Sequence, residues 1–401
     1  MSLGGEKSFK MKMRDMENAF KYRRIPYPKR SIELIAILAI SCTFFLFMHT
    51  NKLNSRLKEM EIKLQPSEFS ALGLTGNHIN SRESARRDNI NTLHGTYQYL
   101  KSTGQLYTLN SNQLNNTVKA EIDVLFFNRL EKVGSQSLSV LLNVLSSRNG
   151  FVPYRNAPLK NTAMLTDFED QRQIVEEIMD EYEMGALSYV EHLNWINFTE
   201  FDYGKPIYIN MVRHPIDKVI SAYNYIRHPA VFAFYLQNGH KMEEKEYFDT
   251  NFNDCIRQKR KECIFDSHNT YNADWRRFAM HFCGNLEICQ QFNSQTATQI
   301  AKQNIESEYA VVGSWEDTNI TLTVFEHYIP RFFRGATKVF YSDPKRFHKN
   351  ATPHKNELDP DIEAKLKVQF SFEIELYNFC KQRLYKQYIA IKKEKLMKEF
   401  H

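Results

Sequence analysis

Hydrophobic residues in the C-terminal two thirds of the chain follow two alternating patterns. Short continuous apolar runs have the length of buried strands, and the longer stretches between them have apolar positions at helical spacing. The runs predict strands at Ile122–Phe127, Ala186–Val190, Ile207–Val212 and Tyr309–Gly313. The helical spacings predict helices at Ser135–Ser147, Gln171–Tyr182, Ile216–Arg227 and Trp315–Ile329, and a long helix from Asp361. This alternation predicts an α/β fold with a mostly parallel sheet flanked by helices.

The longest apolar run lies near the N-terminus. Residues 32–50 contain an uncharged core from Leu34 to Met48, and residues 1–30 carry nine Lys or Arg against three acids. A basic flank before such a run predicts a cytoplasmic tail at 1–31 and an uncleaved signal-anchor helix at 32–50, with the rest of the chain in the secretory lumen. A cleaved signal peptide is the alternative, although the apolar residues continue as Phe44–Met48 beyond the small residues of the run.

Residues 51–118 have the composition of a stem before a luminal catalytic domain at 119–401. Four apolar residues at the start, Leu53, Leu57, Met60 and Leu64, fall at helical spacing over less than two heptads. The remainder is rich in Asn, Ser, Thr and Gly, which predicts a flexible segment. The 401 residues with 42% apolar content suffice for one large domain, and the net charge of +6 suits an anionic ligand but also an ordinary solvated surface.

Sequons and cysteines agree with a luminal location. Four acceptor triplets begin at Asn115, Asn197, Asn319 and Asn350. Apart from Cys42, the cysteines form two local pairs, which predict the disulfides Cys255–Cys263 and Cys283–Cys289 and leave Cys380 as a buried thiol. Zinc prefers a closer cysteine spacing with a histidine at a set distance, and the nearby His281 is expected to be an ordinary surface residue.

A first candidate anion site follows the strand at 122–127, in the stretch FFNRLEKVGSQSL. Backbone amides at the start of a helix, with its dipole and nearby Ser hydroxyls, are suited to a phosphate. The order of residues is not that of a P-loop, and a capped helix with a solvated lysine is the simpler alternative. The predicted anion-binding residues are Arg129, Lys132, Val133, Gly134, Ser135, Gln136 and Ser137.

A second candidate anion site lies in YINMVRHPIDKVISAYNYI. Arg213 ends a predicted strand, Pro215 begins a helix, and Ser221 follows eight residues after Arg213. An Arg and a Ser so placed can hold a separate phosphate, although a capped helix with a surface arginine is again possible. Both motifs stand at carboxyl ends of strands, where ligands bind in open parallel sheets.

The two sites together match a nucleotide phosphorylated at its 5′ and 3′ positions. The pair resembles the sulfotransferases that use 3′-phosphoadenylyl sulfate (PAPS). The stretches NRLEKVGSQS, HLNWINF, KPIYINMVRHPIDKVIS and IPRFFRGAT, with the two cysteine loops, are similar to the glycosaminoglycan uronyl 2-O-sulfotransferase family, most of all to its uronyl and Pipe branch. The resemblance covers about Glu121 to Lys392. It implies a sulfotransferase fold of the P-loop-NTPase type, PAPS as donor, a glycan acceptor, a Golgi type II membrane protein and a homotrimer.

The resemblance also implies the catalytic residues. The family's general base falls on His192, in SYVEHLNWINF, and a histidine is suited to this task by its ordinary pKa near 6.5. A structural histidine is the default reading without the resemblance. Lys132 is expected to stabilise the leaving phosphate oxygen, while Arg213 and Ser221 hold the 3′-phosphate and so select the sulfate donor over ATP. Direct in-line transfer is expected, with no metal requirement.

The chain departs from the family pattern at three positions and matches it at a fourth. Val190 replaces a second histidine of heparan-acting members, so acid–base chemistry is expected to rest on His192 alone. His214 replaces an Asp that would cap the following helix, which predicts a modest effect on stability. Ala222 replaces a Tyr that contacts the acceptor, which argues against heparan sulfate, and Lys349 matches a basic substrate-binding position in the loop Pro344–Lys355.

Three other functions share some of these features. A Golgi glycosyltransferase would have the same anchor, and Asp359-Pro-Asp361 is formally a DxD motif, but it is better explained as the start of a helix. A luminal kinase lacks support because the P-loop lysine and magnesium-binding acids are missing. A non-catalytic glycan-binding membrane protein would use the same basic cleft without transferring a group.

Overall fold

The computed structural model describes residues 91–155, 167–265, 276–347 and 357–399. The predicted cytoplasmic tail, the signal anchor and the first part of the stem lie outside these ranges, as do Lys349 and Asn350. Within the described ranges, no helix has the length and apolar character needed to cross a membrane.

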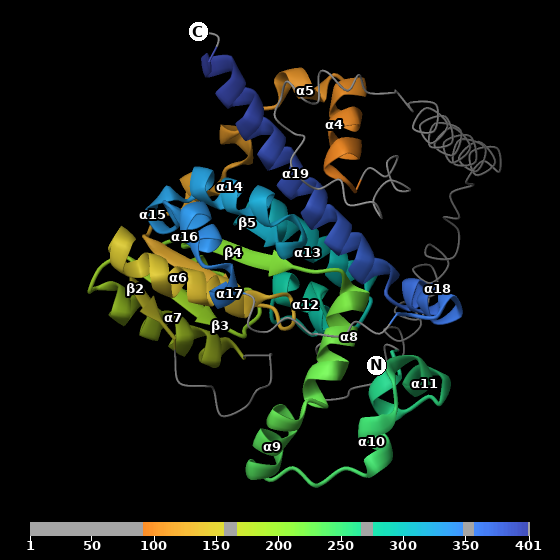
Figure 1. Ribbon diagram of the computed structural model, residues 1–401. Helices are drawn as coiled ribbons and strands as arrows, with labels where there is room; N and C mark the ends of the chain where they lie inside the picture. Colours follow the sequence, from red (N-terminus) through yellow and green to blue (C-terminus); the bar gives the residue numbers. More distant parts are fainter. Residues whose placement is uncertain (1–90, 156–166, 266–275, 348–356, 400–401) are drawn as a thin grey trace, which may run out of the picture. The chain divides into compact units, whose positions relative to one another are not determined.

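A five-stranded parallel sheet forms the centre of the described domain. Its order is β2-β3-β1-β4-β5, and all four pairs of neighbouring strands are parallel. The strands are β1 (Val124–Asn128), β2 (Val152–Tyr154), β3 (Leu187–Glu191), β4 (Ile207–Val212) and β5 (Tyr309–Ser314). Four of the five are buried throughout, because helices cover both faces of the sheet (Figure 1). The mostly parallel α/β fold predicted from the sequence is confirmed, and β2, a partly exposed edge strand, is the strand that was not predicted.

The helices and 3₁₀ turns alternate with these strands along the chain. The predicted helices are found with ends shifted by a few residues, and the long C-terminal helix is divided at Phe370. The described helices are α4 (Leu93–Ser102), α5 (Gln105–Thr108), α6 (Ser135–Asn149), α7 (Phe168–Tyr182), α8 (Pro215–Ile226), α9 (Pro229–Gln237), α10 (Lys245–Asp249), α11 (Phe252–Arg257), α12 (Ala279–Cys283), α13 (Gln295–Ser307), α14 (Thr318–Tyr328), α15 (Pro330–Phe333), α16 (Ala336–Ser342), α17 (Pro344–Phe347), α18 (Pro360–Gln369) and α19 (Ser371–Glu399). The 3₁₀ turns are η2 (Asn112–Leu114), η3 (Asn116–Lys119), η4 (Phe198–Phe201), η5 (Lys261–Cys263), η6 (Glu287–Gln290) and η7 (Trp315–Asp317).

The compact domain begins earlier than the sequence indicated. Residues 93–118, assigned to the flexible stem, form α4, α5 and two 3₁₀ turns, and α4 packs against α19 (Figure 1). The Lys393 ammonium donates to the carbonyl oxygens of Leu106 and Tyr107 at 2.9 and 2.7 Å, and the Gln387 amide donates to Leu114 O at 3.0 Å. These contacts join segments almost 300 residues apart, so local composition gave no sign of them.

A buried polar network joins the carboxyl end of β1 to β4, β5 and α12. The Asn210 amide donates to Asn128 O at 2.7 Å, and the Tyr309 hydroxyl donates to Asn128 Oδ1 at 3.0 Å. The Asn128 amide in turn donates to His281 O at 2.8 Å. A satisfied network of this kind stabilises one arrangement of its members, so β1, β4, β5 and α12 are held together where the candidate site begins.

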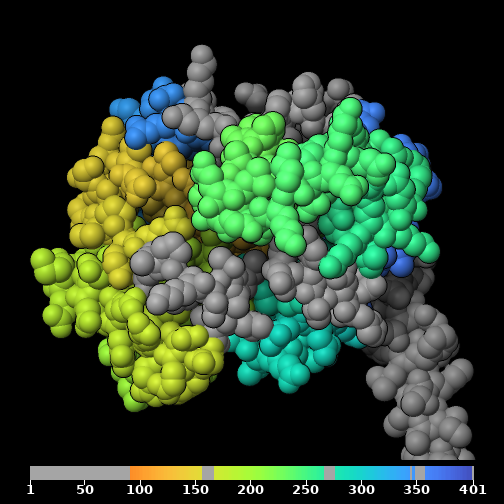
Figure 2. All heavy atoms as spheres, turned by 90° about the horizontal axis from the view of Figure 1, so that it is seen from below, coloured from red at the N-terminus to blue at the C-terminus, as the bar shows by residue number. Residues whose placement is uncertain are grey.

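The segment α8–α11 extends away from the sheet (Figure 1). Figure 2 shows this segment in green over a large part of one face. Its core is a separate cluster of buried residues that includes Val219, Tyr223, Phe252 and Phe370. The Cys255–Cys263 disulfide lies within this cluster, so the covalent bond stabilises a part of the molecule that the sheet does not support.

Candidate active site

The loop between β1 and α6 is held by close packing against Trp315. Gly134 has a φ of +82°, and the Trp315 indole N–H donates to Gly134 O at 2.8 Å. A Cβ at Gly134 would lie 2.4 Å from Trp315 Cδ1, so no side chain fits there without movement. Only a glycine combines the left-handed conformation with this approach.

Helix α6 begins directly after this loop without a side-chain cap. No side chain therefore caps its first amides, and their binding of an anion stays a prediction. The Ser135 hydroxyl donates to Leu130 O at 2.8 Å and the Ser137 hydroxyl to Phe347 O at 2.5 Å, two contacts that the sequence did not predict. Val133 is buried, so it can offer only its main chain to a ligand.

Arg129 and His192 meet where β1 and β3 end side by side. The Arg129 guanidinium lies 3.0 Å (Nε) and 2.7 Å (Nη2) from His192 Nε2, and its Nη1 donates to Gln136 Oε1 at 3.1 Å. His192 Nδ1 lies 3.0 Å from Arg129 O. Since Arg129 can only donate, Nδ1 carries the ring proton and Nε2 is the basic nitrogen. Burial and the Arg129 charge lower the pKa of His192, which keeps the imidazole neutral.

Glu191 and Arg155 support this histidine, and the sequence reading overlooked both. Glu191 Oε1 accepts a hydrogen bond from the His192 amide at 2.8 Å. The Arg155 guanidinium contacts both carboxylate oxygens of Glu191, at 2.6 and 3.2 Å. Although burial opposes it, the Arg155 partner and the His192 amide lower the pKa of Glu191. The one feature of the sequence that could have indicated this support is that Glu191 directly precedes the candidate base.

Lys132 and Arg213 bring the two predicted anion sites together. The Arg213 guanidinium donates to Lys132 O at 3.2 Å, so the strand-end arginine of β4 lies against the β1–α6 loop. The Lys132 ammonium lies 3.6 Å from the centre of the Tyr225 ring, a contact that the sequence did not suggest. Burial, with the neighbouring Arg213 charge, lowers the pKa of Lys132 to about 8. Two cations so close together are suited to an anionic ligand.

At the start of α8, Glu316 provides the carboxylate that the Asp replaced by His214 would have supplied. The His214 amide donates to Glu316 Oε1 at 3.1 Å, and Glu316 also contacts Tyr377 and Lys381. A carboxylate from the turn after β5 thus stands at the N-terminus of α8. Ser221 is buried on α8, and its hydroxyl has no hydrogen bond from the described residues.

Two of the positions that depart from the family pattern, Val190 and Ala222, are buried. Val190 belongs to the main hydrophobic core, and Ala222 is buried in the α8–α11 cluster. His281 is also fully buried, so the expectation of a surface residue was wrong. Burial, with the Lys218 charge as a lesser cause, lowers the pKa of His281 to about 3, so this ring stays neutral.

The other predicted features lie away from this cluster. Cys255–Cys263 and Cys283–Cys289 are disulfides and Cys380 is a buried thiol, as expected. Asp359 and Asp361 both pair with Arg257, at 2.5 and 3.2 Å, where α18 begins. Of the sequons, Asn115 and Asn197 lie at the starts of 3₁₀ turns and Asn319 lies in α14. Among the described residues, no group of three or more His, Cys, Asp or Glu could hold a metal ion.

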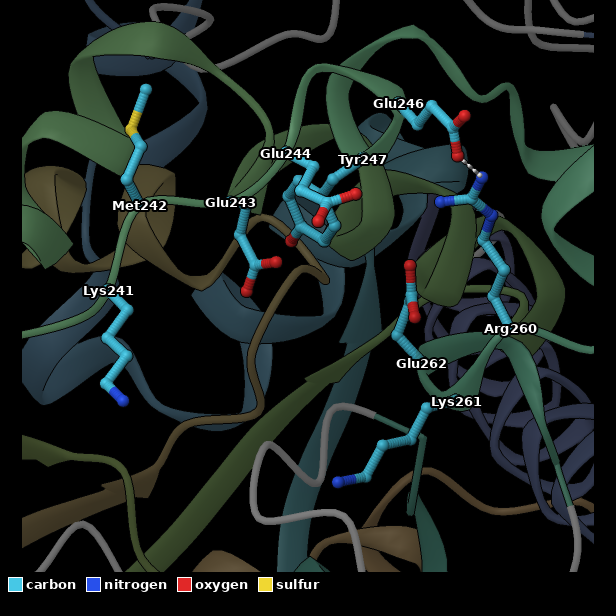
Figure 3. A pocket seen from close by; sticks show the side chains of 9 residues that line it. All are labelled: Lys241, Met242, Glu243, Glu244, Glu246, Tyr247, Arg260, Lys261 and Glu262. Carbon is cyan, nitrogen blue, oxygen red and sulfur yellow. Dashed lines mark hydrogen bonds and ion pairs between the residues drawn. The ribbon is translucent and has the colours of Figure 1, made fainter.

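A surface pocket of about 540 Å³ lies in the segment after α9 (Figure 3). Four of its residues are glutamates and three are cations. Glu246 pairs with Arg260 at 3.3 Å, as Figure 3 shows, and Glu262 pairs with Arg227 at 2.7 Å. With its carboxylates in excess, this pocket is unsuited to a polyanionic nucleotide, whereas the cluster of Arg129, Lys132 and Arg213 is suited to one.

Comparisons with known proteins agree with the geometry. The family model described as "Sulfotransferase family" matches residues 115–380. The uronyl 2-sulfotransferase homolog pip of Drosophila melanogaster is 41% identical over 98% of this chain and 95% of its own length. Human heparan sulfate 2-O-sulfotransferase 1 is 29% identical over 69% of this chain and 75% of its own length. The chicken protein of that name is 28% identical over 64% of this chain and 69% of its own.

Proposed function

The chain belongs to the sulfotransferase family, and from this premise we propose that it transfers sulfate from PAPS to the 2-hydroxyl of a uronic acid, or of a similar sugar, in a glycosaminoglycan or glycoprotein glycan. The single observation that carries the proposal is the contact between Arg129 and His192 at the carboxyl ends of β1 and β3, directly before the loop that contains Lys132. One neutral histidine, with Nε2 as its basic nitrogen, lies beside an arginine suited to a phosphate. Such a site is organised for removal of a proton next to a polyanion.

The residues present fit a doubly phosphorylated donor. The uncapped start of α6 and the Lys132 ammonium offer donors for the 5′-phosphate, and Arg213 offers a guanidinium for the 3′-phosphate. Because Arg213 contacts the Lys132 carbonyl, the two proposed phosphate sites adjoin each other, which supports a single ligand that spans both. When bound, the donor supplies an activated sulfuryl group, which is transferred as the bond between its sulfur and the phosphate oxygen breaks.

His192 receives the proton of the acceptor hydroxyl at Nε2. The hydrogen bond from Nδ1 to Arg129 O fixes this tautomer, and the Glu191 carboxylate holds the His192 main chain. In the structure, the Arg129 guanidinium lies on Nε2, so it must turn away before that nitrogen can take a proton. An anionic ligand would draw the guanidinium away, which couples binding to release of the base. Lys132 stabilises the negative charge that develops on the phosphate oxygen.

The acceptor and the cellular location belong to the same proposal. The names of the relatives support a uronic acid acceptor, and the buried Ala222 argues against a contact of the heparan type at that position. The apolar run at 32–50 supports a signal anchor with the catalytic domain in the Golgi lumen. We infer a homotrimer from the family resemblance alone. The aromatic residues of the C-terminal region do not require it, because Phe370 and Tyr377 are buried within one chain.

The test incubates the purified full-length chain with ³⁵S-labelled PAPS and a panel of desulfated chondroitin, dermatan and heparan chains, followed by disaccharide analysis. We expect label at the 2-position of a uronic acid. Calorimetry with adenosine 3′,5′-bisphosphate and AMP supplies an independent arm, with tighter binding of the bisphosphate expected. Acceptor binding without transfer would instead indicate a glycan-binding protein, and equal affinity for both nucleotides would overturn the proposal.

A further inference from the structure

Tyr225 contacts the lysine on which the proposed chemistry depends. The Lys132 ammonium lies 3.6 Å from the centre of its ring. Tyr225 is in the last turn of α8, far from the β1–α6 loop in sequence, and 48% of its surface is exposed. Its position is therefore not required by the hydrophobic core. Within the described parts of the chain, the Lys132 ammonium has no hydrogen bond and no ion pair.

The surroundings of Lys132 otherwise disfavour its charge. Burial removes water from the ammonium, and the nearby Arg213 adds a repelling positive charge, while Glu131 gives weaker support. These effects lower the pKa of Lys132 to about 8. The face of an aromatic ring attracts a cation, more so when the cation is partly desolvated. The Tyr225 ring is thus the contact that favours both the charge and the position of the ammonium.

We propose that Tyr225 is a positioning residue for Lys132: its ring holds the ammonium in place in the donor-free enzyme and keeps it ready for the leaving phosphate oxygen. The proposal rests on the proposed function, because it assigns a purpose to a residue that supports the same lysine. The ring face makes the contact, so a phenylalanine should serve equally well. The Tyr225 hydroxyl is not required.

The test compares Tyr225→Leu, which removes the ring, with Tyr225→Phe, which keeps it. The Leu variant should lose roughly 10–100-fold in kcat with little change in the KM for the acceptor, because Lys132 is misplaced rather than absent. The alkaline limb in its pH profile of kcat/KM, which reports the pKa of Lys132, should move to lower pH by about half a unit to one and a half units. The reason is that the ring no longer favours the charged ammonium. The Phe variant should match the parent protein in both measurements.

A direct readout does not need turnover. The pKa of Lys132 can be measured by NMR after ¹³C reductive methylation of the lysines, with the Lys132→Arg variant identifying the signal. The pKa should fall in Tyr225→Leu and stay unchanged in Tyr225→Phe. Tyr341→Leu is the matched control, because Tyr341 is 51% exposed on α16 and contacts Phe340 instead of a lysine. It should leave the pKa, kcat and the pH limb unchanged.

The outcomes separate this inference from the proposed function. An unchanged Lys132 pKa in Tyr225→Leu, or a Phe variant as impaired as the Leu variant, would overturn the role of the ring. Absence of transfer by the parent protein would instead refute the sulfotransferase activity. The NMR comparison would still show whether the Tyr225 ring affects the pKa of Lys132. Thermal unfolding of each variant shows that it is folded, and Tyr225→Met repeats the comparison if the Leu variant is unstable.

Discussion

Substitution of Gly134 by Ala tests whether the loop before α6 is built as the donor site. The residue has a φ of +82°, and an added Cβ would meet Trp315 Cδ1 at 2.4 Å. Ordinary van der Waals contact begins at 3.4 Å, so the loop or the indole must move by about 1 Å. The left-handed conformation costs an Ala about 1–2 kcal/mol, and overpacking adds about 1–3 kcal/mol. We therefore expect a loss of about 2–5 kcal/mol in the free energy of unfolding.

Gly150→Ala is the matched control. Gly150 ends α6 at a φ of +65°, but an added Cβ would have no heavy atom within 4 Å. Its substitution should cost only the conformational part, about 1–2 kcal/mol. The difference between the two variants in urea unfolding therefore measures the contact with Trp315.

The same pair distinguishes binding from stability. Gly134→Ala should weaken the binding of adenosine 3′,5′-bisphosphate by at least roughly 10-fold in calorimetry, since a 1 Å shift misplaces the amides that hold the phosphate. Gly150→Ala should bind it normally. If both variants lost equal stability and bound the nucleotide equally well, the close packing of this loop would have no part in the site.

The remaining predictions concern the base, its pH dependence and the disulfides. His192→Ala should lose roughly 10²–10⁴-fold in kcat with unchanged bisphosphate affinity, while the exposed His240→Ala stays active; near-normal turnover would remove His192 from its role. Because the pKa of His192 is lowered, the acidic limb of the pH profile, along which activity rises with pH, should lie below pH 6.5. Arg129→Ala removes a charge that lowers this pKa, so it should move the limb to higher pH. An acidic limb above pH 6.5 in the parent protein would contradict this prediction. Replacing Cys283 and Cys289 by Ser should cost about 2 kcal/mol of unfolding free energy, given the short loop that they close, and an unchanged urea midpoint would disagree.

Local sequence patterns were sufficient to predict four of the five strands and the turn at which the candidate site begins. β1, β3, β4 and β5 are continuous apolar runs, because a parallel strand buried on both faces needs apolar residues throughout. The Gly134 turn into α6 could be predicted because its chemistry is contained in consecutive residues. The short edge strand β2 was not predicted, because a run of three residues is too short to show a strand pattern.

Contacts between distant segments could not be predicted in this way. The sequence placed His281 on the surface, yet it is buried, and it assigned residues 93–118 to a flexible stem, yet they pack against α19. The sequence also did not predict that the hydroxyls of Ser135 and Ser137 donate to Leu130 O and Phe347 O. Each of these outcomes depends on which element packs beside the residue, and a local pattern does not contain that information.

The amino-acid sequence by itself determined the parallel α/β fold, the pairs of cysteines and the residue types at the candidate site, since each depends on neighbours along the chain. Only the tertiary structure decided that Arg129 lies on the basic nitrogen of His192, that Tyr225 holds Lys132 and that Glu316 stands at the start of α8. The reason is physical. A side chain's type follows from the sequence, but its protonation state and partners follow from the charges and rings that folding places beside it.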